Sequence, residues 1–484
     1  MSGADPSAQT IYQIINSAVQ PLTDTVESTF FFAVPVAGAD LPLIVLWLII
    51  GGLFFTVYLR FINVRGFMHA WAVLTGKYAQ SDDPGEISQF RALTTAISGT
   101  VGIGNIAGVA VAISMGGAGA TFWLIVAGLL GMSTKMAECT LGVRYRRIDA
   151  QGKVSGGPMY YLRHGFGELN RPRLGRALGG FYAATMVLGC LGIGNMFQSN
   201  QSAAILIDIT GGDASPIAGM GWLVGLIMAI AVGVITLGGI RSIAATTVRM
   251  VPFMALLYIV LALLVILLDI ERLPKAVARI WHGAFSPEGV AGGVLGVMII
   301  GFRRAVFSNE AGLGSAAIAH STARTPFPAS EGHIGLLGPF IDTVVICTLT
   351  ALVLIITGHD AVAPGTLSGI ELSTRAFEST LSWSGIPLAV CALLFAFSTI
   401  IGWEYYGVIA FTYLLGDSRL ARIGFQLIFL GFVIIGASIE LTAVVDLSDA
   451  LVFIIAIPNL IGLYLLAPVI KAEIDRYAAH RSRT

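Results

Sequence analysis

The chain has 484 residues, of which 56% are hydrophobic and only 12% are charged, and acidic and basic residues balance to a net charge of zero. Soluble domains carry about 25% charged residues, so this composition excludes an ordinary soluble protein. The zero net charge gives no reason to expect a nucleic-acid partner.

Apolar runs of helical length, such as residues 41–59, recur along the whole chain. Lipid-exposed backbone has to satisfy its own hydrogen bonds, and these runs are continuous rather than alternating, so helices are favoured over barrel strands. We therefore expect an all-α membrane protein with about eleven transmembrane helices. The predicted spans are residues 39–62, 89–114, 118–142, 178–207, 217–237, 246–269, 289–316, 334–358, 384–415, 421–439 and 446–470.

Basic residues in the loops predict the orientation of the chain in the membrane. Residues 1–39 contain no Lys or Arg, whereas the connection 143–177 contains eight of them and the tail after residue 470 contains more. We therefore expect an N-terminus outside, a C-terminus in the cytoplasm and a location in the cell (inner) membrane. The basic loop between the sixth and seventh spans disagrees with this orientation, because basic loops favour the cytoplasm and this topology places the loop outside.

Two predicted spans, five apart in the chain, are interrupted by glycine and polar residues. The second span reads SGTVGIGNIAGVA at 98–110 and the seventh reads GFRRAVFSNEAGLGSA at 301–316. Interrupted helices at matching positions of two halves indicate an inverted repeat with a central binding site. The expected organisation is an extracytoplasmic segment 1–38, a leading helix with a cytoplasmic connector 39–88, repeats 89–269 and 289–470, and a cytoplasmic tail 471–484.

The interruption of the second span suits both a carboxylate and a cation. Gly99, Gly102 and Gly104 each destabilise a continuous helix by about 1 kcal/mol relative to alanine. Where a helix opens, its N–H groups can bind an anion and its freed carbonyls can bind a cation. Asn105 at the same place favours this hypothesis. The alternative is close helix packing, since Gly104 and Gly108 form a GxxxG pair.

Spans four and nine contribute further polar candidates. In the fourth span Gln198 shares a helix face with other polar side chains, which could equally bind neighbouring helices. In the ninth span Thr399 and Trp403 are four residues apart and share a face. Ser398 and Thr399 offer the oxygen ligands that hard cations prefer, although such hydroxyls also bond to their own helix.

Charged residues inside spans are costly and indicate function by default. Lys135 and Glu138, three residues apart, favour a structural ion pair over a site. A second set fits either a cytoplasmic-side gate or simple pairing, and comprises Arg303, Arg304, Glu310 and Asp342. We expect no enzyme, since no nucleophile–base or metal-ligand spacing is visible, and a passive channel would not need two interrupted helices around a fitted pocket.

Several long motifs closely resemble the alanine or glycine:cation symporter family. They include GGAGATFWLIVAGLLGMSTKMAE at 116–138, SGGPMYYL at 155–162, FSNEAGLGSA at 307–316 and FSTIIGWEYYG at 397–407, and the similarity extends over roughly residues 40–470. The VGIGN run at 101–105 is similar to the opened first core helix of LeuT-type amino-acid symporters. The resemblance implies a LeuT-type fold with a 5+5 inverted repeat, two broken helices and one additional leading helix.

The resemblance also implies roles for individual residues. The substrate carboxylate would lie near the backbone of Ile103 and Gly104, and Gly102 would also belong to the substrate-binding site. A break around Gly301 and Phe302 would bind the amino group or close the pocket. The sodium site would comprise the carbonyls of Ser98 and Val101 with Ser398 and Thr399. The substrate pocket would be lined by Asn105, Gln198, Thr399 and Trp403, with Trp403 restricting its size.

These residues lead us to expect a sodium-coupled symporter that imports alanine, glycine or both by alternating access, in contact with membrane lipid. Na⁺ would be the coupling ion, with no other cofactor. Proton coupling or a wider substrate range is the alternative. The family pattern usually has a small residue where Glu404 stands and a glutamate where Val408 stands, so substrate range or ion coupling could differ in this chain.

Overall fold

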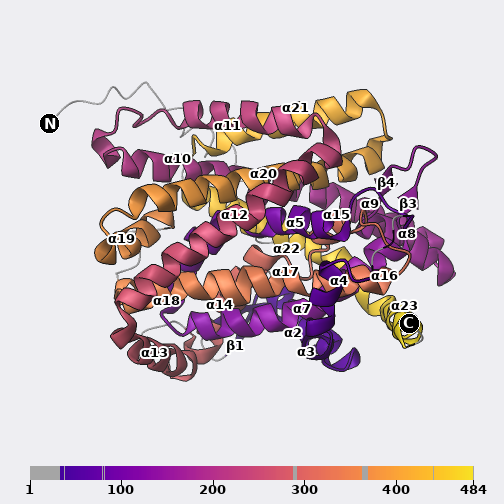
Figure 1. The fold of residues 1–484 in the computed structure, drawn as a ribbon, viewed down its shortest axis with the longest axis horizontal. Coiled ribbons are helices and arrows are strands. Elements are labelled where there is room, and N and C mark those ends of the chain that lie inside the picture. Colours follow the sequence, from indigo (N-terminus) through magenta and orange to yellow (C-terminus); the bar gives the residue numbers. More distant parts are fainter. Residues whose placement is uncertain are drawn as a thin grey trace.

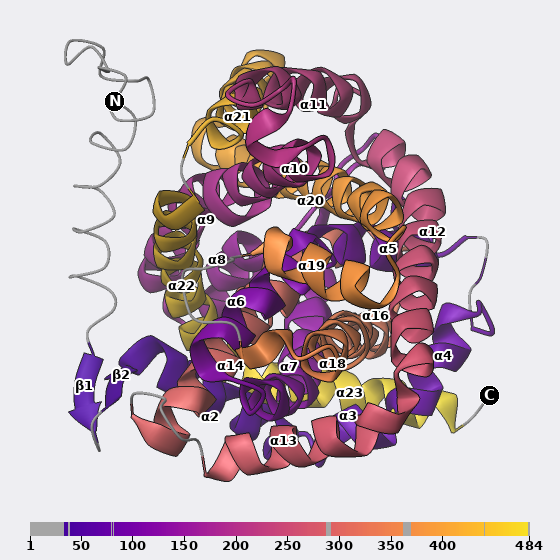
Figure 2. The ribbon, with the colours of Figure 1, turned by 90° about the vertical axis from the view of Figure 1, so that its left-hand side faces the viewer.

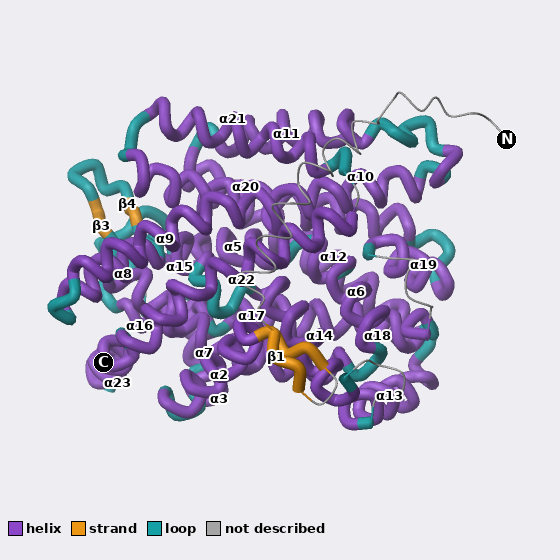
Figure 3. The backbone as a smooth tube through the Cα atoms, turned by 180° about the vertical axis from the view of Figure 1, so that it is seen from behind, coloured by secondary structure: helices purple, strands orange, loops and turns teal. Residues whose placement is uncertain are grey.

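The computed structural model is a bundle of long, roughly parallel helices (Figure 1). It describes residues 33–36, 39–78, 80, 82–286, 292–361, 369–439 and 441–482. The segment expected outside the membrane, 1–38, lies outside the described residues except for 33–36. The strands form two short antiparallel hairpins, β1 (Ala33–Val36) with β2 (Ala39–Pro42) and β3 (Arg147–Ile148) with β4 (Val154–Ser155) (Figure 3).

Continuous apolar sequence forms the long helices, and short polar segments begin or end them; Ser88 and Ser418, for example, each accept a backbone N–H at a helix start. The helices up to residue 268 are α2 (Leu43–Tyr58), α3 (Ile62–Arg65), α4 (Phe67–Leu74), α5 (Gln89–Thr100), η1 (Ile103–Asn105), α6 (Ala107–Gly116), α7 (Ala120–Arg144), α8 (Pro158–Glu168), α9 (Pro172–Leu191), η2 (Gly192–Met196), α10 (Phe197–Ile209), η3 (Gly212–Ala214), α11 (Gly221–Thr236) and α12 (Gly239–Leu268). The later helices are η4 (Ile270–Arg272), α13 (Leu273–Phe285), α14 (Gly293–Asn309), α15 (Ser315–His320), α16 (Pro328–Gly335), α17 (Leu337–Pro339), η5 (Phe340–Cys347), α18 (Thr348–Ile356), η6 (His359–Ala361), α19 (Ile370–Thr380), α20 (Gly385–Leu415), α21 (Arg419–Gly436), α22 (Leu441–Leu465) and α23 (Ala467–Arg481).

Each predicted span has a helical counterpart in the described part of the chain. Seven helices there are long and apolar enough to cross a membrane, and the bent pair of α5 with η1–α6 forms an eighth candidate. The shorter apolar helices α2 and α11 correspond to the first and fifth predicted spans, and α14 with α15 to the seventh. The all-α membrane fold predicted from the sequence is therefore confirmed, with fewer full-length spans than the eleven expected.

Different elements lie at the two ends of the bundle. The β3–β4 hairpin, α8, α23 and the C-terminus lie at one end, whereas α13, α18 and α19 meet at the other (Figure 1). The basic connection 143–177 and the C-terminal helix thus lie at the same end, which we expect to face the cytoplasm. Most of the predicted tail is helical, as part of α23, which ends at Arg481.

The interrupted helices lie inside the bundle. α5 packs between α12 and α20, and α14 packs between α6 and α7, whereas α11 and α21 lie together at the periphery (Figure 2). At the first interruption, α5 ends at Thr100 and η1–α6 departs at 62° to it. This agrees with the break expected from the glycines of 98–110.

The second interruption lies elsewhere than expected. α14 runs unbroken through Gly301 and Phe302 and ends at Asn309, after which Glu310 adopts a left-handed conformation with φ 58°. The chain is open between Glu310 and Gly314, because α15 begins only at Ser315. The predicted break around Gly301 and Phe302 is therefore wrong. A Cβ on Gly301 would lie 2.8 Å from the carbonyl oxygen of Ala120, so this glycine allows α14 and α7 to approach closely.

Candidate functional site

The first interruption diverts backbone donors from their helical acceptors. In a continuous helix the N–H of Gly102 would bond to the carbonyl of Ser98. Here it donates instead to Oδ1 of Asn105 at 2.9 Å, and the N–H of Asn105 donates to the carbonyl of Gly102 at 3.1 Å. The carbonyls of Ser98 and Val101 consequently lose their helical donors, which is what their predicted role as cation ligands requires.

Side chains of three helices meet at Gly102. The N–H of Ile103 donates to Oε1 of Gln198 on α10 at 3.0 Å. A Cβ on Gly102 would overlap Oγ1 of Thr399 on α20 and lie 3.0 Å from Oε1 of Gln198. The structure thus brings together Gly102, Ile103, Gln198 and Thr399, as the resemblance implied, although the N–H of Ile103, which we expect to face a carboxylate, donates here to an amide oxygen.

The predicted sodium ligands come from the end of α5 and from α20. These helices approach closely, since a Cβ on Gly402 would lie 3.1 Å from Oγ of Ser98. The hydroxyl of Ser398 bonds within its own helix, to the carbonyl of Phe395 at 2.9 Å. Oγ1 of Thr399 is buried and has no hydrogen-bond partner among the described residues. An unpartnered buried hydroxyl beside Gly102, where α5 has ended, suits a hard cation such as Na⁺.

Asn105 connects the first interruption to the eighth predicted span. Its Nδ2 donates to Oδ1 of Asp342 at 2.6 Å and approaches Sγ of Cys347 at 3.2 Å. Its carbonyl accepts the hydroxyl of Thr350 at 2.7 Å. Asp342 is fully buried and also accepts from Ser308 at 2.9 Å. The side chain of Asn105 is therefore held at both ends of its amide: Oδ1 accepts from the N–H of Gly102, and Nδ2 donates to Asp342.

Trp403 is the largest fully buried side chain and lies between the two interruptions. Its Nε1 donates to the carbonyl of Gly99 at 3.1 Å and to Oε1 of Glu310 at 2.9 Å. Its ring packs against Gly194 of η2, where any Cβ would overlap the indole. The indole therefore fills a space bounded by α5, the α14–α15 break and η2.

The second interruption is held by residues that the sequence suggested would pair with each other. Nζ of Lys135 donates to the carbonyl of Glu310 at 3.1 Å, whereas Oε1 of Glu138 accepts the N–H groups of Gly312 and Gly314 at 2.9 and 3.0 Å. The expected Lys135–Glu138 ion pair is absent from the ion pairs of the described residues. Helical spacing favoured that pair, but the open backbone offers each charged group a better partner.

The remaining predicted residues lie apart from this centre or close to its edge. Gly301 lies against Ala120 and Trp123 of α7, the ring of Phe302 lies near that of Trp123, and the structure does not bring them together with Gly102. Gly104 lies at the edge, since a Cβ there would be 3.6 Å from the ring of Phe307. Arg303 and Arg304 both pair with Asp449 of α22.

Sequence reasoning missed several contacts of the centre. Glu310 and Asp342 were recognised as unusual charges within spans, but nothing in the sequence indicated their partners Trp403 and Asn105. The sulfur of Cys347, a buried residue of the core, also lies 3.2 Å from Nδ2 of Asn105, and nothing in the sequence indicated this contact. Gly194, beneath the indole, lies in the GIGN sequence at 192–195, which repeats four residues of the first interruption.

Comparison with known proteins gives a consistent result. The profile of the "Sodium:alanine symporter family" matches residues 27–484. The "Sodium/alanine symporter AgcS" of Methanococcus maripaludis is 39% identical over 437 residues, covering 89% of this chain and 93% of that protein. The "Probable sodium/glutamine symporter GlnT" of Bacillus subtilis is 34% identical over 441 residues, covering 91% and 88%. The crystal structure of MhsT in complex with L-phenylalanine superposes with a TM-score of 0.57 at 16% identity, covering 81% of this chain and 98% of that one, and so shares the LeuT-type fold.

Proposed function

This chain belongs to the sodium:alanine symporter family and is a transporter rather than an enzyme, and we propose that it imports a small neutral amino acid, alanine, glycine or both, together with Na⁺. The observation that carries the proposal is the first interruption, where freed carbonyls, an unpartnered threonine hydroxyl and backbone N–H groups converge on Gly102. These are the groups that an α-amino acid and a hard cation require.

Sodium would be held by the carbonyls of Ser98 and Val101 together with the hydroxyls of Ser398 and Thr399. Such an ion would join α5 to α20, because Ser98 belongs to α5, Val101 directly follows it, and the other two ligands belong to α20. Binding of the ion would therefore favour conformations in which these helices stay together. A ligand can shift a conformational equilibrium only by its difference in affinity between the two conformations, and a site divided between two helices provides such a difference.

The substrate carboxylate would bind at the N–H groups of Gly102 and Ile103. In the described arrangement these donors are occupied by Oδ1 of Asn105 and Oε1 of Gln198. A carboxylate would replace these amide oxygens without leaving the donors unsatisfied. The amide of Gln198 could then turn its Nε2, which now donates to the carbonyl of Ile193 at 3.0 Å, toward the substrate. Gln198 would thus accept the N–H of Ile103 in the empty pocket and bind the substrate in the loaded one.

The experiment that tests this proposal is uptake of radiolabelled alanine into proteoliposomes with an imposed Na⁺ gradient. We expect uptake to rise with external Na⁺ and to saturate with alanine. Equal uptake in choline medium with an imposed proton gradient would contradict sodium coupling and support the proton-coupled alternative. Uptake that never saturates would indicate a channel.

A wider substrate range is the second candidate. One relative, 34% identical over most of its length, is named for glutamine rather than alanine. The buried indole of Trp403 argues for a small pocket in this chain, because it fills the space against Gly194 that a longer side chain would need. Competition by unlabelled glutamine in the same uptake assay separates the two candidates.

A further inference from the structure

A cavity of about 310 Å³ is lined in part by Lys153 and Val154 of the basic connection. The β3–β4 hairpin of that connection lies at the same end of the bundle as the C-terminus (Figure 1). The cavity is formed by α20, α21, the turn between α11 and α12, and residues next to β4. Small-molecule sites start at about this size. On α20, Glu404 at the cavity follows Thr399 by five residues, which corresponds to about 7.5 Å along a helix.

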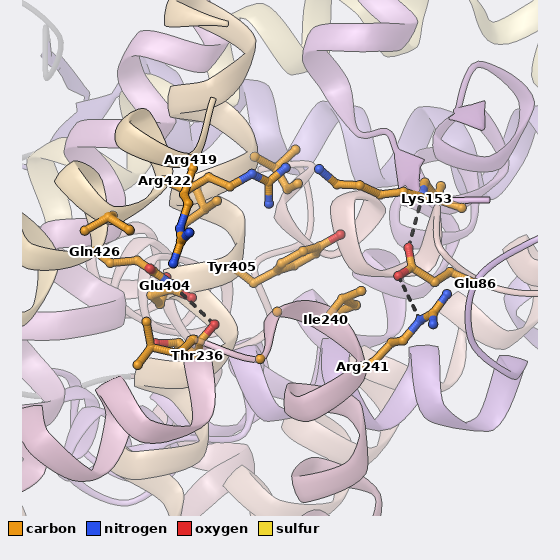
Figure 4. A pocket seen from close by; sticks show the side chains of 17 residues that line it. Glu86, Lys153, Thr236, Ile240, Arg241, Glu404, Tyr405, Arg419, Arg422 and Gln426 are labelled. Atoms are coloured by element: carbon orange, nitrogen blue, oxygen red, sulfur yellow. Dashed lines mark hydrogen bonds and ion pairs between the residues drawn. The ribbon is translucent and has the colours of Figure 1, made fainter. Parts of the chain in front are cut away.

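One side of this cavity contains two buried polar atoms that lack partners. Oε1 of Glu404 and Oγ1 of Thr236 make no hydrogen bond within the described structure, and both residues are only 2% exposed. They lie on the same side of Tyr405, beside Gln426, as Figure 4 shows. An unpartnered carboxylate oxygen and an unpartnered hydroxyl in one place indicate a missing hydrogen-bond donor.

The rim of the cavity is basic. Arg419, Arg422 and Lys153 surround the opening, and in Figure 4 the Arg422 guanidinium points down toward the Glu404 side. Arg422 and Lys153 share one acidic partner, Asp417, at 2.6 Å each, whereas no ion pair of Arg419 is present in the described structure. On the far side of Tyr405, Glu86 and Arg241 neutralise each other at 3.4 Å. An excess of positive charge therefore stands opposite one buried, incompletely partnered carboxylate.

From this arrangement we propose that the cavity is a second binding site for a zwitterionic α-amino acid. The ammonium group donates to Glu404 and Thr236, and the carboxylate is held by Arg419 and Arg422. A simple anion would pair with the basic rim but would place negative charge beside Glu404. A simple cation would pair with Glu404 but would be repelled by the guanidinium groups of the rim. A molecule that carries both charges a few ångströms apart satisfies both sides.

The site lies on the side of the molecule at which an imported amino acid would be released, and this part of the argument depends on the proposed function. Glu404 follows Trp403 directly, so α20 presents one residue to each of the two sites. The cavity thus gives a role to Glu404, one of the two positions at which this sequence departs from its family pattern.

The test is equilibrium binding of radiolabelled L-alanine to the full-length protein in nanodiscs of phosphatidylcholine, with and without Na⁺. We expect two components, of which the one at the cavity needs no Na⁺. Glu404→Gln, which keeps the side-chain shape, and Arg419→Gln, at the exposed rim, should each remove the sodium-independent component and leave the sodium-dependent one. Glu371→Gln, which removes a carboxylate from α19 at the opposite end, is the matched control.

The chemistry of the ligand is tested by competition. Glycine should displace the sodium-independent component, whereas L-lactate, which lacks the ammonium group, and alaninamide, which lacks the carboxylate, should not. Identical isotherms for the parent and Glu404→Gln would overturn the proposal, as would displacement by lactate. A component that disappears when phosphatidylethanolamine is added would assign the cavity to a lipid headgroup and also overturn it. Loss of the sodium-dependent component in the parent would instead contradict the proposed function.

Discussion

The indole Nε1 of Trp403 and the carboxylate Oε1 of Glu310 lie 2.9 Å apart and form a hydrogen bond between α20 and the α14–α15 break. The same Nε1 lies 3.1 Å from the carbonyl of Gly99, just before the α5 break. One side chain therefore contacts both interrupted helices. Because Glu310 also accepts from the hydroxyl of Ser315, its carboxylate fixes the position of the indole and of the start of α15 together.

The backbone at Gly102 should tolerate no side chain. Gly102→Ala would place a Cβ in overlap with Thr399 and 3.0 Å from Oε1 of Gln198, so we expect sodium-dependent alanine uptake to be lost. Gly108→Ala, six residues further on, meets nothing within 4 Å and should transport normally. Both variants should be measured in proteoliposomes at equal protein content. Normal uptake by the Gly102→Ala variant would remove this break from the binding site.

The hydroxyl of Thr399 should contribute to sodium affinity rather than to folding. Thr399→Val keeps the shape of the side chain and removes an oxygen that has no partner within the described structure. Loss of one such contact, worth about 1–2 kcal/mol, should raise the Na⁺ concentration for half-maximal uptake roughly 5- to 30-fold. Thr412→Val on the same helix, where the hydroxyl bonds to the carbonyl of Val408 at 2.8 Å, is the control. An unchanged sodium dependence in Thr399→Val would contradict the ligand assignment.

The first interruption could be predicted from sequence because glycine and asparagine act locally there. The glycines weaken the helix, and Asn105 bonds back to the N–H of Gly102 three residues earlier. The second interruption could not be placed, since its position depends on residues far away in the chain. Glu138 supplies an acceptor for the N–H groups of Gly312 and Gly314, so the helix opens at these glycines rather than at Gly301.

The partners of the buried charged side chains could not be predicted from the sequence pattern either. Helical spacing suggested that Lys135 would pair with Glu138, but spacing along one helix carries no information about a neighbouring open backbone. Lys135 bonds to the carbonyl of Glu310, 175 residues away in the chain. Asn105 and Asp342 are 237 residues apart, and only packing of the eighth predicted span against the first break brings them together. Composition predicts that such charges need partners, and tertiary structure decides which.

The orientation in the membrane is open to direct labelling. We expect the N-terminus outside and the C-terminus in the cytoplasm, because basic residues are concentrated between 143 and 177 and after residue 470. A cysteine introduced at position 8 should react with an impermeant maleimide in intact spheroplasts, whereas one at position 482 should react only after lysis. The four native cysteines are buried and should give little background. Labelling in the opposite order would reverse the topology.

Substrate size should be set by Trp403 and by the carboxylate that holds it. Trp403→Phe leaves an aromatic ring but removes both Nε1 hydrogen bonds and part of the volume, so we expect valine and leucine to compete with alanine uptake. Glu310→Leu, which removes the acceptor of the Trp403 Nε1–H, should shift selectivity in the same direction by releasing the indole. One methylene changes affinity by about 1–3 kcal/mol in an apolar pocket, so the change in competition should be at least tenfold. A panel of unlabelled amino acids against labelled alanine measures it.

Two comparisons separate a selectivity effect from general damage. Trp383→Phe alters a tryptophan that is 57% exposed between α19 and α20, and should leave the competition profile unchanged. Asn105→Ala removes the hydrogen bond from Nδ2 to Asp342 that orients the first interruption, and should lower affinity for all amino acids alike, because that interruption binds groups that all of them share. Truncating a buried tryptophan to alanine costs about 3–5 kcal/mol, which is why phenylalanine is the informative replacement. A Trp403→Phe protein that transports alanine and still rejects valine as strongly as the parent would remove the indole from the pocket wall.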